Sequence, residues 1–95
     1  MNVELLFDKN SAEFGKFNSI NSEEKLHNDP MVCALLYLDS IYPGEIHYHH
    51  SENGKGLFIH GLNFNIDDLV NKDVLYLIRC GVKYDRESDN LVFIR

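Results

Sequence analysis

Apolar and polar residues alternate most regularly over residues 43–61, around an Asn-Gly pair. This pattern favours a β-hairpin, because asparagine and glycine tolerate the positive φ angles of a tight turn. The register that follows pairs Tyr48 with Ile59. It also places His47 opposite His60. One face of the hairpin is then expected to join the core, and it carries Ile46, Tyr48, Leu57 and Ile59. The other face carries the histidines, and its residues are His47, His49, Phe58 and His60.

Helical patterns precede and follow this hairpin. Asp29 is a predicted N-cap with Pro30 at the first helical position, and the apolar run from Met31 to Leu38 covers every side of the helix. We therefore expect this helix to be central and buried. A second helix is predicted from Asn65, whose side chain can cap it, and it ends at Gly81.

The remaining segments complete an α+β prediction. Residues 82–95 read as a second hairpin around a polar turn, and the alternation over residues 2–7 favours a short strand. An isolated hairpin is marginally stable in water, so we expect both hairpins to share one sheet. The predicted fold is a single domain over residues 1–95, with an antiparallel sheet built from two β-hairpins and two main helices packed on one face. Residues 1–28 form a polar segment that we expect to be mobile, and residues 29–95 form the core.

Length and composition agree with one self-sufficient domain. The chain has 95 residues, of which 44% are hydrophobic, so a core forms without metal or disulfide support. Cys33 and Cys80 lie in apolar stretches and lack CxxC spacing, which favours buried, reduced thiols and a cytoplasmic location. No signal peptide is recognised, and the longest apolar run is too short to span a membrane.

The charge balance narrows the choice of partner. Nine Lys and Arg residues stand against fifteen Asp and Glu, for a net charge of −6. Binding to nucleic acid through its phosphates needs a basic cluster, which the sequence does not contain. An acidic surface instead attracts basic proteins. The acidic residues expected to surround the histidine side of the first hairpin are Glu45, Glu52, Asp67 and Asp68.

The histidines of the first hairpin allow three interpretations. Alternation brings His47, His49 and His60 to one face, where they could hold a zinc ion with a fourth position left for water. The same residues with Phe58 could form a protein-binding patch, since an outward aromatic beside histidines is typical of an interface anchor. They also fit a solvated sheet face without any ligand. A homodimer through this face or an edge strand is a further alternative.

The sequence contains no recognised nucleophile or phosphate-binding motif, and among its many carboxylates no pair is singled out for acid–base catalysis. The serines lack a GxSxG or SxxK context, the glycines form no phosphate-binding loop, and Cys33 lies in the most apolar stretch. We therefore predict a small acidic non-enzymatic protein that inhibits a basic protein partner. Immunity proteins and antitoxins against nucleases, and phage-encoded inhibitors of nucleic-acid enzymes, are proteins of this kind. The alternative is a metal-binding domain built on the three histidines.

Overall fold

The chain folds into three α-helices, three short 3₁₀ helices and one sheet in the part that the structure describes. The structure is a computed structural model, and it describes residues 3–50, 56–60 and 65–94. The elements in chain order are α1 (Val3–Lys9), η1 (Ser11–Glu13), η2 (Phe17–Ser19), α2 (Pro30–Ile41), β1 (His47–His50), β2 (Gly56–His60), η3 (Ile66–Asp68), α3 (Asn71–Cys80), β3 (Val82–Asp85) and β4 (Asn90–Ile94).

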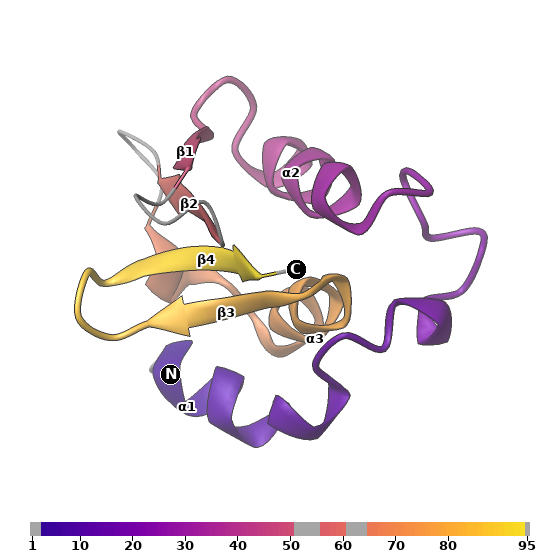
Figure 1. The fold of residues 1–95 in the computed structure, drawn as a ribbon, viewed down its shortest axis with the longest axis horizontal. Helices are drawn as coiled ribbons and strands as arrows, with labels where there is room; N and C mark the ends of the chain where they lie inside the picture. The colour runs from indigo at the N-terminus through magenta and orange to yellow at the C-terminus, as the bar shows by residue number, and fades with distance from the viewer. Residues whose placement is uncertain (1–2, 51–55, 61–64, 95) are drawn as a thin grey trace.

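The sheet has four antiparallel strands in the order β1-β2-β4-β3 (Figure 1). The prediction of an α+β fold with an antiparallel sheet is therefore confirmed. β2 and β4 are its central strands, and β1 and β3 are its edges. α3 lies next to β3 at the right-hand end of that strand in the view of Figure 1, and α1 lies beside β3. β1 and α1 therefore lie at opposite ends of the sheet.

The first strand pair has the register that the alternation predicts. Tyr48 pairs with Ile59 and His47 pairs with His60, while the predicted Asn53-Gly54 turn lies outside the described residues. Ile59 is buried, as predicted for the core face. Tyr48 is 57% exposed, so its expected burial is wrong. The reason is its position: β1 is an edge strand, and the core beneath the central strands does not extend under the Tyr48 ring.

The predicted second helix is divided in two. The Asn65 side chain accepts a hydrogen bond from the backbone N–H of Asp67 at 3.1 Å and caps η3 rather than a long helix. The backbone is then extended at Val70, and α3 begins at Asn71. The predicted end is confirmed, because Gly81 has φ 107° in the left-handed region and donates to backbone carbonyls of the last turn.

The predicted start of α2 is confirmed, but the predicted burial of the helix on every side is not. Asp29 caps the helix by accepting hydrogen bonds from two backbone N–H groups of the first turn. However, only Cys33, Ala34 and Leu38 are buried, and Leu36 is 43% exposed. α2 packs against α3. In Figure 1, α2 lies clear of β3 and β4, so a buried central position for it is wrong.

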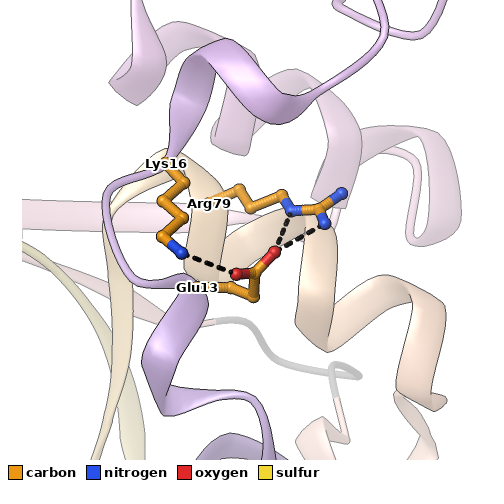
Figure 2. Close-up of polar contacts among 3 residues, drawn as sticks. All are labelled: Glu13, Lys16 and Arg79. Atoms are coloured by element: carbon orange, nitrogen blue, oxygen red, sulfur yellow. Dashed lines mark hydrogen bonds and ion pairs between the residues drawn. The ribbon is translucent and has the colours of Figure 1, made fainter.

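The N-terminal segment is helical and packs on α3. Residues 2–7 were expected to form a strand, but α1 buries Val3, Leu6 and Phe7, which follow helical spacing, and leaves Leu5 61% exposed. Beyond α1, a salt bridge joins Glu13 of η1 to Arg79 of α3, with 2.7 Å between Oε1 and Nη2 (Figure 2). Residues far apart in sequence are thus held together at this end of the molecule.

Glu13 also receives a second cation. The Lys16 ammonium lies 3.1 Å from Glu13 Oε2, so each carboxylate oxygen has its own positive partner (Figure 2). The Arg79 hydrogen bond and then the Lys16 hydrogen bond lower the pKa of Glu13 below its usual value. The backbone N–H of Gly15 donates to the Ile78 carbonyl at 3.0 Å, which ties the same segment to α3.

Candidate functional site

The predicted histidine face lies along the edge strand β1. His47 and His49 are exposed, and the His49 ring stacks on the Phe58 ring with 5.3 Å between centroids and 23° between planes. Phe58 is half-buried and pairs with Val92 of β4, which pairs in turn with Lys83 of β3. Because paired residues share one side of a sheet, these side chains form a row across its outer side. We call His47, His49 and Phe58 the histidine face.

The three-histidine metal site stays a prediction. The backbone of His60 pairs with His47, but the His60 side chain lies outside what the structure describes. Within the described part of the chain, no group of three or more His, Cys, Asp or Glu residues is placed to hold a metal ion. His47 and His49 are the two candidate ligands whose positions on β1 the structure shows.

The predicted acidic residues separate into two groups. Glu45 is half-buried in the connection just before β1, and its backbone N–H donates to the Tyr42 carbonyl at 3.1 Å. Asp67 and Asp68 are exposed in η3. Glu52 lies outside the described residues. Of the predicted acidic residues that the structure describes, Glu45 is therefore the one that lies next to the histidine face along the chain.

The two η3 carboxylates, Asp67 and Asp68, help to raise the pKa of two tyrosines. Burial, followed by the charge of Asp68, raises the pKa of Tyr42. The hydrogen bond to Asp89, burial, and the charges of Asp89, Glu4 and Asp67 raise the pKa of Tyr84 to about 12. Asp67 and Asp68 thus contribute to the negative potential around two tyrosines, and nothing places them in contact with the histidine face.

A groove between α2 and β1 is the feature that the sequence pattern did not reveal. It has a volume of about 360 Å³. Exposed Leu36 of α2 and exposed Tyr48 of β1 contribute to its lining. The residues of this α2–β1 groove are Met31, Val32, Leu35, Leu36, Asp39, Ile46 and Tyr48. The sequence held one signal for such a groove, namely that α2 is apolar on every side. A small domain cannot cover a whole helix, so part of that apolar surface has to remain exposed.

The chain around this groove carries negative charge alone. Residues 26–54 contain no Lys or Arg and four carboxylates, at Asp29, Asp39, Glu45 and Glu52. The last turn of α2 has no basic residue to offset the negative end of the helix dipole, and Asp39 lies there instead. Asp39 Oδ1 accepts a hydrogen bond from the Gly44 backbone at 3.1 Å. A positively charged group is therefore favoured at this end of the groove.

The thiols are structural. Cys33 and Cys80 are free and buried, as predicted. Burial and then the neighbouring Cys33 thiol raise the pKa of Cys80, which disfavours a reactive thiolate. Cys33 Sγ lies 2.9 Å from the Tyr76 hydroxyl in the contact between α2 and α3. These groups fix the packing of the two helices, and they give no support to nucleophilic chemistry.

Comparison of the chain with models of protein families, with characterised proteins and with solved structures gives no match. No helix in the described ranges has the length and apolar character needed to cross a membrane.

Proposed function

We propose that the protein is a small, acidic, non-enzymatic binding protein that occludes a basic protein partner. The observation that carries the proposal is the surface around β1. All four β1 residues are exposed, and this strand lies within a 29-residue stretch, 26–54, that has no Lys or Arg. A surface of this kind attracts a basic protein over a distance and offers aromatic contacts once the two proteins meet.

The histidine face supplies the contact area in this proposal. The stacked rings of His49 and Phe58 form a flat, partly apolar platform, and aromatic residues of this type often contribute most of the binding energy of an interface. Glu45, Glu52, Asp67 and Asp68 add negative charge to the molecule that carries the platform. The partner class that fits is a nuclease or another nucleic-acid enzyme, because its own substrate requires a basic surface. An immunity protein, an antitoxin or a phage-encoded inhibitor acts by covering such a surface.

The proposal includes a cytoplasmic location. Two buried, reduced thiols are typical of proteins in a reducing compartment, where the nucleic-acid enzymes of a cell also work.

Capture from an extract of the native host tests this function. The purified protein is immobilised, retained proteins are eluted with salt from about 50 to 500 mM, and the eluted proteins are identified. We expect a basic protein that elutes with rising salt and that is not retained by a His47→Ala, His49→Ala double variant. A matched control carries Asn18→Ala and Ser19→Ala, two exposed positions of η2. Retention of no basic protein would overturn the proposal.

Zinc binding is the second candidate, favoured by the register that pairs His47 with His60 while His49 lies two residues along the same strand. Calorimetric titration with zinc decides between the two functions. Micromolar binding that is lost in His47→Ala and in His60→Ala supports a metal site. An absence of binding, or binding unchanged in both variants, removes it.

A further inference from the structure

We propose that the α2–β1 groove receives a basic amphipathic helix of the partner, with apolar side chains inserted between Leu36 and Tyr48 and a Lys or Arg at the Asp39 end. The inference deepens the proposed function and rests on it, because it names the segment of the basic partner that the surface recognises. Three observations support it, namely the shape, the lining and the charge of the groove.

The shape of the groove suits a helix. Its α2 wall is a stripe at positions 31, 32, 35, 36 and 39, which is the spacing of one helix face. From Met31 to Asp39 this stripe rises about 12 Å, or slightly more than two turns. A partner helix that lies along it presents side chains at i, i+3 or i+4, and i+7 over the same length.

The lining is apolar where such a helix would insert its side chains. Six of the seven lining residues are apolar or aromatic. Leu36 is 43% exposed and Tyr48 is 57% exposed, so the two sides of the groove present apolar surface to solvent. The volume of about 360 Å³ is at the lower end of the range for ligand pockets, and it suits a few inserted side chains. The groove also borders β1, on the side of the strand opposite His47 and His49, because Tyr48 alternates with them along the strand.

The charge selects a basic occupant. Asp39 is the single charged residue of the lining, and it lies in the last turn of α2, where the helix dipole is negative. No Lys or Arg lies within residues 26–54 to neutralise it. A cation at this end of the partner helix gains from the carboxylate and from the dipole, and the Tyr48 ring adds a face for a cation–π contact. An acidic or neutral helix gains none of these contributions.

A synthetic peptide tests the groove without knowledge of the natural partner. The probe is a fluorescein-labelled helical peptide of about 15 residues with leucines at i, i+4 and i+7 and lysines on the other face. Two control peptides replace every lysine by glutamate, or every leucine by serine. Binding is followed by fluorescence anisotropy at low and at physiological salt. The variants are Leu36→Ser, Tyr48→Ala and Asp39→Asn, matched by Leu5→Ser and Asp8→Asn on α1, where both residues are exposed.

We expect the leucine–lysine peptide to bind with a dissociation constant on the order of ten micromolar. Leu36→Ser, Tyr48→Ala and Asp39→Asn should each weaken it about fivefold or more, and the two α1 variants should leave it unchanged. Equal binding of the serine–lysine peptide would overturn the groove and leave the acidic docking function standing. Equal binding of the leucine–glutamate peptide would overturn the charge selection. A His49→Ala variant of the histidine face is measured in the same series. Loss of affinity in His49→Ala with none in the three groove variants would overturn the inference, and so would an absence of binding.

Discussion

The Tyr37 hydroxyl of α2 donates a hydrogen bond of 2.5 Å to Asp73 Oδ1 of α3, and the Asp73 side chain is almost fully buried. The second oxygen of Asp73 accepts from the Val70 backbone N–H at 3.1 Å, at the start of α3. One carboxylate therefore begins α3 and joins it to α2. The Tyr37 ring also stacks on Tyr76, with 4.0 Å between centroids. Since α2 forms one wall of the groove, this contact helps to position the proposed docking surface.

Replacing Tyr37 by phenylalanine should lower the free energy of unfolding by about 1–2 kcal/mol, because a hydrogen bond to a buried carboxylate is lost while the ring stack is kept. Urea denaturation followed by circular dichroism measures the change. Tyr48→Phe is the matched control, since that ring is exposed and its variant should stay within about 0.5 kcal/mol of the wild type. Equal stability of the two variants would show that the Tyr37–Asp73 contact contributes nothing.

The Tyr76 hydroxyl holds the connection before α2. It donates to the Glu24 carbonyl at 2.8 Å and accepts from the Leu26 backbone N–H at 3.4 Å. The hydroxyl has a single proton, so in its 2.9 Å contact with Cys33 Sγ the thiol is the donor. Tyr76→Phe leaves these partners unsatisfied and should loosen the chain around Lys25. We predict several-fold faster trypsin cleavage after Lys25, measured by mass spectrometry.

Tyr84→Phe is the control for that experiment, because its hydroxyl bonds to Asp89, far from the trypsin site in the fold. It should leave the rate of cleavage after Lys25 unchanged. Unchanged cleavage in Tyr76→Phe as well would show that other contacts hold this connection.

Tyr84 should titrate well above the usual range of a phenol. Its pKa is raised to about 12 from 10.0, chiefly because its hydroxyl donates to Asp89. A raised folded-state pKa means that the stabilisation is fully present below pH 10 and is lost as the pH rises toward 12. NMR titration of the Tyr84 ring measures the value. Asp89→Asn keeps a residue that tolerates the positive φ of 54° and should return the pKa toward 10.

Asp85→Asn is the matched variant for the Tyr84 titration, since Asp85 accepts from Ser88 and is not among the groups that shift Tyr84. A Tyr84 pKa that is the same in Asp89→Asn as in the wild type would contradict the assignment to Asp89.

Glu13 should contribute to stability at neutral pH and lose this contribution in acid. The Arg79 and Lys16 partners lower its pKa, so the contribution is fully present above the unfolded-state pKa and is lost as the pH falls from there through the lowered folded-state pKa. Glu13→Gln should therefore lower the melting temperature at pH 7 and lower it less as the pH falls toward 3. Glu87→Gln, at an exposed turn position, should change it little at either pH. A Glu13→Gln effect of equal size at both pH values would exclude the ion pair as its cause.

Strong local signals in the sequence predicted several elements correctly. The pairing of Tyr48 with Ile59, the Asp29 cap and the Gly81 helix end each depend on neighbouring residues, so the pattern alone is sufficient. The first helix was missed because the apolar residues near the N-terminus fit two patterns equally well. Val3, Leu5 and Phe7 have the alternate spacing of a strand, whereas Val3, Leu6 and Phe7 have the spacing of one helix face. Only packing against α3 and β3 separates the two possibilities.

The candidate site was only partly predictable for a related reason. Alternation shows which way Tyr48 points, but it does not show how far the core extends beneath an edge strand. The apolar pattern of α2 likewise does not reveal that Leu36 remains exposed. Both facts depend on the position of α2 relative to β1, which long-range packing determines. The groove between them therefore became visible only in the structure.

Hydrogen–deuterium exchange on the complex with the salt-eluted basic partner tests the central claim, which is that the partner docks at β1. We predict slower amide exchange in α2 over residues 31–39 and in β1 over residues 47–50, with unchanged exchange in α1 over residues 3–9. Protection confined to α1 or to the turn at 85–90, with α2 and β1 unaffected, would contradict the account.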